Sequence, residues 1–203
     1  FEFWVEDLNR VDITVGVGVS AVTYVEYLPQ SDPYPNLASF IASSVDTSRT
    51  TASILAGDGV TILSYVKDVG GTAATTADGA TWSPAGDIYP DHFAENTTPG
   101  TTDMQPATQL AVDFVAANGG GIVNLLGDTY LFADTVTISD GGICIRGSGM
   151  YQTVVTKNTD FGDTFLFTGD DTTGAVISGS SISDMTLQAT ALTTSGALIR
   201  MNG

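Results

Sequence analysis

Three consecutive glycines at positions 119–121 separate two different kinds of sequence pattern. The residues before them predict a helix over about 103–117. Thr102 and Asp103 are suited to the N-cap, and Pro106 lies where an early-turn proline is tolerated. Glycine readily adopts the left-handed conformation that ends a helix. The apolar side chains expected on one face of this helix are Leu110, Ala111, Phe114 and Val115.

Beyond the glycines, the period changes to short apolar runs separated by glycine and aspartate, a pattern typical of strands. The strands expected are 122–126, 130–132, 135–138, 143–145, 154–155, 165–167, 175–177, 182–187 and 197–199. The order of one amphipathic helix followed by a ladder of very short strands indicates a helix that covers the open edge of a stack. The sequence therefore predicts a mainly β fold.

The helix, the glycine triplet and the motif ICIRGSGM at 143–150 resemble the entry of the pectate-lyase-like parallel β-helices, the fold of phage tailspike shafts. The resemblance covers about 91–203 and implies the capping helix and first coils of a right-handed parallel β-helix. Val123, Ile145, Phe167 and Leu187 recur at intervals of 22, 22 and 20 residues, and intervals of about 20 residues or more suit the coils of a solenoid. We therefore expect these four residues to be equivalent.

The N-terminal third also reads as β-structure. Alternating apolar residues predict three strands over 1–28, with a turn at 7–10. Prolines predict a loop over 29–35. A short helix is expected over 37–42 and a strand over 62–66, whereas Ile54 and Leu55 are compatible with a weak helix or with a strand.

Residues 70–90 form a distinctive connector. Its motifs DGATWSP at 78–84 and YPDHF at 89–93 resemble the linker of phage tailspikes, where a small attachment domain joins the β-helix. The two resemblances together imply three parts. These are a small β-rich virion-attachment domain over 1–69, a connector over 70–95 and the start of the β-helix over 96–203.

The charge balance constrains the partners. Six basic residues stand against 23 acidic ones, for a net charge of −17. This charge disfavours binding to naked nucleic acid and to anionic lipid, which both require a positive surface. It suits an extracellular or virion surface. No apolar run approaches the roughly 20 residues of a membrane span, and the strand-like pattern at both ends predicts that the chain belongs to a longer polypeptide.

Carboxylates are the candidates for polysaccharide cleavage, because glycosidases use a pair of them. The candidates are Asp128, Asp134, Asp140, Asp160, Asp163, Asp170, Asp171 and Asp184. Most flank glycine or threonine, where aspartate commonly caps a turn, so solvated turn residues are the preferred interpretation. A lyase would need basic groups, for which Arg146, Lys157 and Arg200 are available in this half of the chain. The match at 143–150 favours a structural role for Arg146 at a coil corner.

The remaining candidates are also assigned to structure. His92 is expected to pack at the domain junction, because it lies within the linker motif. Cys144, the single cysteine, is expected to be a small buried apolar residue between two isoleucines. One cysteine and one histidine do not form a zinc site. Four aromatic residues are expected in the core: Tyr130, Phe132, Phe165 and Phe167.

These patterns predict no catalytic, cofactor-binding or metal-binding residue within 1–203, and no cofactor. The resemblance implies the N-terminal, anchoring part of a homotrimeric phage tailspike. Its expected partners are a phage tail or baseplate protein, bound through 1–69, and a host surface polysaccharide, bound by later coils. Two alternatives remain: part of a polysaccharide-degrading lyase or hydrolase with catalytic groups beyond residue 203, and a bacterial surface adhesin.

Overall fold

The computed structural model describes residues 2–7, 10–15, 22–27, 33–45, 47–158, 162–169, 177–190 and 196–202. The first three strands are β1 (Glu2–Asp7), β2 (Arg10–Val15) and β3 (Val22–Tyr27). They form an antiparallel sheet in the order β1-β2-β3. Asp7 pairs with Arg10, which places a reversal where the sequence predicts a turn. Of the range 1–28 in which the sequence predicts three strands, residues 1, 8–9, 16–21 and 28 lie outside the described residues.

A second, four-stranded antiparallel sheet has the order β4-β5-β7-β6 and is called the small sheet below. Its elements are α1 (Leu37–Ile41), β4 (Thr51–Leu55), β5 (Ile62–Lys67), β6 (Ala74–Thr75) and β7 (Thr81–Ala85). Phe40 of α1 is fully buried, and its ring packs against those of Tyr65 and Trp82. The ambiguous pair Ile54 and Leu55 is thus part of a strand.

The small sheet contains strands from both sides of the domain boundary predicted at residue 69. Strands β6 and β7 come from the segment expected as a connector, and β7 pairs along β5 from Lys67–Trp82 to Ser64–Ala85. Trp82, from the linker motif, is a core residue of this sheet. A short 3-10 helix, η2 (Pro90–His92), follows. The division of the chain into domains remains a prediction, but a cut at residue 69 would divide this sheet.

Helix α2 (Gln105–Ala117) lies where the sequence predicts a helix, and Gly119, Gly120 and Gly121 after it all have positive φ. The expected apolar face needs correction, because Leu110 is 47% exposed and Phe114 is half-buried. The face that the helix buries instead consists mainly of small side chains: Ala107, Thr108, Ala111, Val112 and Val115. Small residues allow the helix axis to approach the strands closely.

The remaining strands form three parallel, three-stranded sheets. The strands are β8 (Gly121–Asn124), β9 (Thr129–Phe132), β10 (Val136–Ile138), β11 (Ile143–Arg146), β12 (Val154–Lys157), β13 (Phe165–Thr168), β14 (Ser181–Ser183), β15 (Thr186–Ala189) and β16 (Ile199–Asn202). The chain visits the three sheets in turn three times, which is the path of a parallel β-helix. We call this part the coil. Helix α2 contacts β8, β10 and β11 of the coil.

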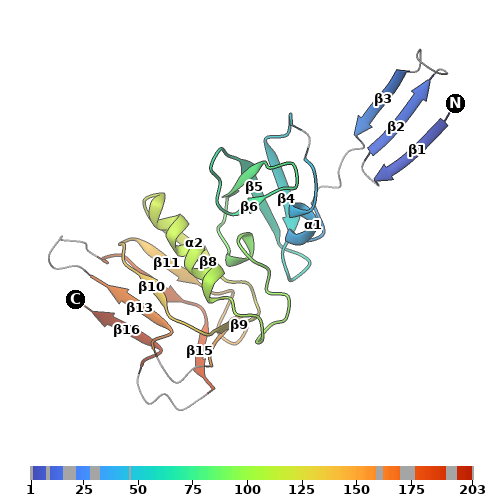
Figure 1. Ribbon diagram of the computed structural model, residues 1–203. Coiled ribbons are helices and arrows are strands. Elements are labelled where there is room, and N and C mark those ends of the chain that lie inside the picture. The colour runs from blue at the N-terminus through green and yellow to red at the C-terminus, as the bar shows by residue number, and fades with distance from the viewer. Residues whose placement is uncertain are drawn as a thin grey trace.

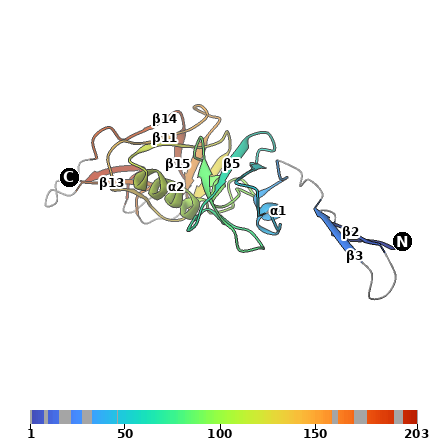
Figure 2. The same ribbon diagram turned by 90° about the horizontal axis from the view of Figure 1, so that it is seen from above.

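The small sheet and the coil lie next to each other, and the C-terminus is at the far end of the coil from the small sheet (Figures 1 and 2). The described structure is therefore mainly β, as predicted. Among the described residues, no helix has both the length and the apolar character needed to cross a lipid bilayer.

Of the four residues predicted to occupy equivalent positions in successive turns of the coil, only the first two do so. Val123 pairs with Ile145, 22 residues later, but Ile145 pairs next with Ile182. Phe167 lies instead on the β10-β13-β16 sheet, where it pairs with Ile138 and Met201. Leu187 pairs with Val155 on the third sheet. The second turn of the coil is longer than the first, so a constant interval fails.

Three strand predictions also change. The run 182–187 is divided into β14 and β15 by Asp184, which has a positive φ of 57°. The strand expected over 197–199 begins at Ile199. Of the run 175–177, residues 175 and 176 lie outside the described residues, and Ile177 is not in a strand.

Candidate functional site

The segment between β7 and α2 joins the small sheet to the coil and is the best candidate for a functional site. On the coil side, the backbone N–H of Asn124 donates to the carbonyl of Ile88 at 2.7 Å. The side-chain amide of Asn96 donates to the carbonyl of Thr129 at 3.1 Å. On the sheet side, the hydroxyl of Tyr65 donates to the carbonyl of His92 at 2.9 Å. We call residues 88–96, with these contacts, the junction.

His92 packs at the junction, as its position in the linker motif predicts. The ring is fully buried and stacks edge-on against Tyr65. The N–H of Tyr89 donates to Nδ1, and Nε2 lies 3.2 Å from the carbonyl of Ser64. This pattern places the ring proton on Nε2. Burial lowers the pKa of His92 to about 4, so the ring is neutral at physiological pH.

Asp91, next to His92, is the most perturbed carboxyl group of the junction. It is 1% exposed, and burial raises its pKa to about 6. The hydroxyl of Tyr130 on β9 lies 3.4 Å from Asp91 Oδ2 and accepts a 2.8 Å hydrogen bond from the N–H of Leu126. Burial raises the pKa of Tyr130 as well. Asp91 and Tyr130 therefore connect the junction to the coil, and the N–H of Leu126 fixes the position of the Tyr130 hydroxyl.

Two buried oxygens at the junction have no hydrogen-bond partner among the described residues: Oδ1 of Asp91 and Oδ1 of Asn96. The side-chain nitrogen of Asn96 is already directed at Thr129 O and, at 3.5 Å, at Asp128 Oδ2. Gly57 lies against this group, because a Cβ built there would be 3.6 Å from Asp91 Oδ1. Burial disfavours an ionised Asp91, whereas hydrogen bonds from the backbone of Asn96 and of Asp91 itself and from the Tyr130 hydroxyl favour it. The effect of burial is the larger one, so the pKa is raised.

The junction contains groups used in acid–base chemistry, but it is closed. Asp91, His92 and Tyr130 are each at most 1% exposed. A general acid must reach the atom that it protonates, and no sugar ring can approach these side chains. The arrangement is suited to holding two parts of the chain in a fixed relation. Within the described part of the chain, no group of three or more histidine, cysteine, aspartate or glutamate residues could hold a metal ion.

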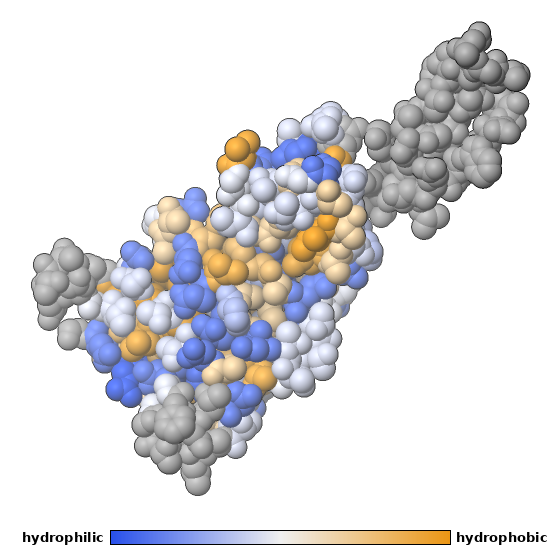
Figure 3. All heavy atoms as spheres, in the orientation of Figure 1, coloured by the Kyte–Doolittle hydropathy of each residue, from blue (hydrophilic) through white to orange (hydrophobic). Residues whose placement is uncertain are grey.

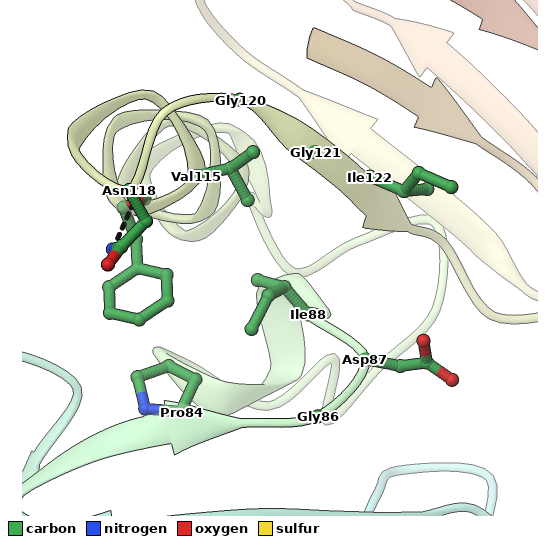
Figure 4. A pocket seen from close by; sticks show the side chains of 10 residues that line it. Pro84, Gly86, Asp87, Ile88, Val115, Asn118, Gly120, Gly121 and Ile122 are labelled. Atoms are coloured by element: carbon green, nitrogen blue, oxygen red, sulfur yellow. Dashed lines mark hydrogen bonds between the residues drawn. The ribbon is translucent and has the colours of Figure 1, made fainter. Parts of the chain in front are cut away.

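A hollow of about 460 Å³ lies beside the junction, between the end of β7 and the end of α2. Pro84, Ile88 and Val115 point toward one another across it, whereas Asp87 points away (Figure 4). Ile122 of β8 forms another part of its wall. The lining is mainly apolar and offers few groups that could orient a polar ligand.

Of the predicted carboxylates that the structure describes, none lines this hollow. Asp128 and Asp134 each accept a hydrogen bond from the following backbone N–H, as turn residues do. Asp140 and Asp184 are exposed. Asp160, Asp170 and Asp171 lie outside the described residues.

Asp163 is different, because it is 7% exposed and pairs with Arg200 at 2.9 Å. It also accepts the N–H of Ala197 at 2.7 Å, so it connects successive turns of the coil. Arg146 has a comparable role on another sheet, where its guanidinium donates to Oδ1 of Asn124 at 2.8 Å. Neither contact brings two carboxyl groups together for glycoside cleavage.

Lys157 on β12 is 1% exposed, and its Nζ has no hydrogen-bond partner among the described residues. Burial lowers its pKa, while the charges of Asp134, Asp103 and Asp163 act in the opposite direction. Sequence patterns gave no indication that this lysine is buried. A lysine in an apolar strand is expected to turn its charged end to solvent.

The four predicted core aromatics are buried: Tyr130, Phe132, Phe165 and Phe167. The prediction for Cys144 is wrong. Cys144 is only half-buried, because Ile143 and Ile145 are the inward-facing residues of β11. Its sulfur accepts a hydrogen bond from Ser181 of the next turn at 3.2 Å.

Sequence reasoning did not select Asp91, Asn96 or Tyr65, although these residues complete the junction. The available signal was the position of Asp91 inside the linker motif YPDHF. Because the burial of each depends on the meeting of two distant parts of the chain, periodicity within one segment could not identify them.

No protein-family model matches the sequence, and no curated protein is significantly similar to it. Solved structures are similar in fold. The tailspike protein gp49 of Acinetobacter baumannii bacteriophage Fri1, a capsular polysaccharide depolymerase, superposes with a TM-score of 0.60 at 14% identity over 85% of this chain and 36% of that one.

Full-length tailspike protein 2 of an Escherichia coli O157:H7 bacteriophage gives a TM-score of 0.54 at 15% identity over 98% of this chain and 29% of that one. The enzymatically active domain of bacteriophage CBA120 tailspike protein 2 gives 0.54 at 15% identity, over 83% of this chain and 26% of that one. The chain thus spans about a quarter to a third of these structures. It has the fold of the corresponding part of a phage tailspike.

Proposed function

We propose that this chain is the anchoring and neck portion of a homotrimeric phage tailspike, a virion component that binds a host surface polysaccharide. The observation that carries the proposal is the similarity of 85% of the chain to a tailspike, with a TM-score of 0.60. The attachment to a tail or baseplate protein is assigned to residues 1–69, and glycan binding to later coils.

The junction supports this assignment, because its buried side chains hold the small sheet and the coil in a fixed relative position and are not accessible to a substrate. Tyr65, His92 and Asp91 form a closed group between the small sheet and the coil. A spike that anchors at one end and binds at the other requires such a rigid connection. The net charge of −17 disfavours nonspecific adhesion to other anionic surfaces.

A second candidate function is that of a polysaccharide depolymerase. The specific observation in its favour is that the similar gp49 tailspike is a capsular polysaccharide depolymerase. The chain corresponds to 36% of gp49, and the carboxylates described here do not form a catalytic pair, so we assign cleavage to residues beyond 203. A depolymerising spike would combine both functions.

The first test is the mass of the intact protein, measured denatured and then native. We expect a denatured mass above 21.0 kDa and a native mass three times the denatured mass. A native mass equal to the denatured mass would contradict the trimer. Incubation with purified capsular polysaccharides then separates binding from cleavage, because a lyase releases unsaturated sugars, a hydrolase releases saturated reducing ends and a binder releases neither.

The anchoring assignment needs a separate test that leaves the small sheet intact. A deletion of residues 1–32 preserves Tyr34, which bridges to Ile54 of β4. We expect the shortened spike to remain trimeric but to be missing from purified virions. Incorporation of the shortened spike at the normal level would show that the first sheet does not attach it.

A further inference from the structure

The small sheet has one face turned to the core and one face turned outward. Ile54, Leu63 and Tyr65 alternate with their neighbours and are buried against α1 and the rest of the core. The residues of β4, β5 and β7 on the opposite side are called the outward face. They are Thr51, Ser53, Leu55, Ile62, Ser64, Val66, Ser83 and Ala85.

None of these eight residues is charged, although the chain has 23 acidic residues. Two of them are apolar and exposed: Ile62 is 56% and Val66 38% exposed. Val60 and Val69, two residues beyond the two ends of β5, are 79% and 103% exposed. Leu55 lies directly opposite Ile62 on the neighbouring strand. Figure 3 shows scattered apolar residues among hydrophilic ones on one side of the molecule.

Single exposed apolar residues are common, but a contiguous uncharged face with an apolar strip indicates an interaction surface. Carboxylates lie at the rim of this face. Asp68 accepts a hydrogen bond from the side chain of Ser83 at 3.0 Å, and Asp58 lies in the turn between β4 and β5, where it accepts from the N–H of Thr61 at 2.8 Å. The hydrogen bond from Ser83 holds the carboxylate of Asp68 against the sheet. The centre of the face, around Ser64, is left without charge.

We propose that the outward face of the small sheet is where copies of this chain meet one another in the assembled spike. Each copy has a net charge of −17, so copies that meet through acidic surfaces repel one another. Association therefore favours a surface without carboxylates. A basic virion protein would gain little from this face, because the face offers it no negative charge.

The edges of the small sheet support a contact through the face instead of a shared strand. The outer side of β4 is occupied by Tyr34, whose N–H donates to Ser53 O at 2.8 Å and whose carbonyl accepts from Leu55 N at 2.8 Å. At the other side, β6 consists of two residues. Strand addition has little room at these edges, whereas Ile62, Ser64 and Val66 of the outward face are exposed.

The proposal rests on the trimer proposed above and assigns its contact surface. The main variant is Ile62→Glu in the full-length spike, which places a carboxylate next to Leu55 on the outward face of every copy. Leu110→Glu is the matched control, because Leu110 is 47% exposed on α2, away from the small sheet. Ile62→Ser tests the loss of the apolar side chain without added charge.

We expect Ile62→Glu to raise the concentration at which the trimer dissociates by at least tenfold, measured by native mass spectrometry on a dilution series. Leu110→Glu should leave that concentration unchanged, and Ile62→Ser should give an intermediate effect. Circular dichroism of each variant confirms that the fold is kept. Raising the salt concentration should partly restore assembly of Ile62→Glu, because the introduced carboxylates are screened.

A charge-reversal experiment tests whether Ile62 lies close to its own copies around the three-fold axis of the trimer. Ile62→Lys alone should assemble as poorly as Ile62→Glu alone, since like charges then face each other. A mixture of the two should form mixed trimers. If the wild-type spike is trimeric and both variants assemble as well as it does, the proposed contact surface is wrong but the proposed trimer is not. If the wild-type spike is monomeric, both proposals are wrong.

Discussion

The hydroxyl of Tyr130 lies 3.4 Å from Oδ2 of Asp91, which is 39 residues earlier in the chain. The tyrosine belongs to the first turn of the coil, and the aspartate to the segment that leaves the small sheet. Both groups are removed from solvent, and the same hydroxyl is fixed by the N–H of Leu126. The stability of the connection between the small sheet and the coil therefore depends on whether the carboxyl group of Asp91 is protonated.

Asp91 should make the protein less stable as the pH rises. Its pKa in the folded state is about 6, above the 3.8 of an exposed aspartate. The folded state therefore binds the proton more tightly than the unfolded chain does. The contribution of the protonated group is complete below pH 3.8 and is lost as the pH rises through 6. The full effect is about 3 kcal/mol, from 1.36 kcal/mol per pKa unit.

The variant Asp91→Asn should remove this dependence, because the amide stays neutral and still accepts from Tyr130. We expect it to be more stable than the wild type at pH 8 and similar below pH 3.8, as measured by urea unfolding at a series of pH values. Asp87→Asn, an exposed position in the same connection, is the control. Parallel pH profiles for wild type and Asp91→Asn would contradict the prediction.

Tyr130→Phe should destabilise the protein more than Tyr65→Phe. The first change removes a donor to Asp91 and the acceptor of Leu126 N–H, and leaves buried groups unpaired, at a cost of about 1–3 kcal/mol. The second removes one neutral hydrogen bond to the carbonyl of His92, worth about 1 kcal/mol. Chemical denaturation of both variants at pH 7 gives the comparison. Equal losses would show that the Tyr130 hydroxyl has no larger role than a single bond.

Much of the coil was predictable because its signals are local. The triplet Gly119-Gly120-Gly121 ends α2 and starts β8, and all three residues have the positive φ that favours glycine. The first coil interval, from Val123 to Ile145, followed from the spacing of apolar residues. The aromatic core residues were identified in the same way.

The later coils were not predictable because their turns lengthen without a sequence period. Ile145 pairs with Ile182, an interval of 37 residues in place of the 22 of the first turn. Thr186 and Ser183 belong to different sheets, since the left-handed conformation of Asp184 turns the chain between them. The junction was equally inaccessible, because the burial of Asp91 requires contacts from β9.

Gly147→Ala should disrupt the stacking of the coil. A Cβ at this position would be 2.2 Å from the carbonyl oxygen of Asp184 in the next turn, and backbone cannot move aside as a flexible side chain can. We expect a loss above about 2 kcal/mol, as for overpacked core sites. Gly79→Ala is the control, because it introduces left-handed strain with no atom within 4 Å. A thermal midpoint for Gly147→Ala equal to that of Gly79→Ala would contradict the close contact.

Lys157→Met should leave the protein as stable as the wild type or make it more stable. The Nζ atom is buried and has no hydrogen-bond partner among the described residues, so the charged form is held at a cost. Replacement of a buried charged group by an apolar side chain of similar length is commonly neutral or stabilising, by about 1–4 kcal/mol. Asp163 retains Arg200 as its ionic partner. Urea unfolding at pH 7 measures the change.

Lys157→Ala separates packing from charge in the same experiment. It removes the charge as Lys157→Met does, but leaves a cavity in the coil, for which a loss of about 2 kcal/mol or more is expected. The methionine variant should therefore be clearly more stable than the alanine variant. A Lys157→Met protein as destabilised as Lys157→Ala would show that the ammonium group is held by favourable interactions with the surrounding carboxylates, and that its burial stabilises the coil.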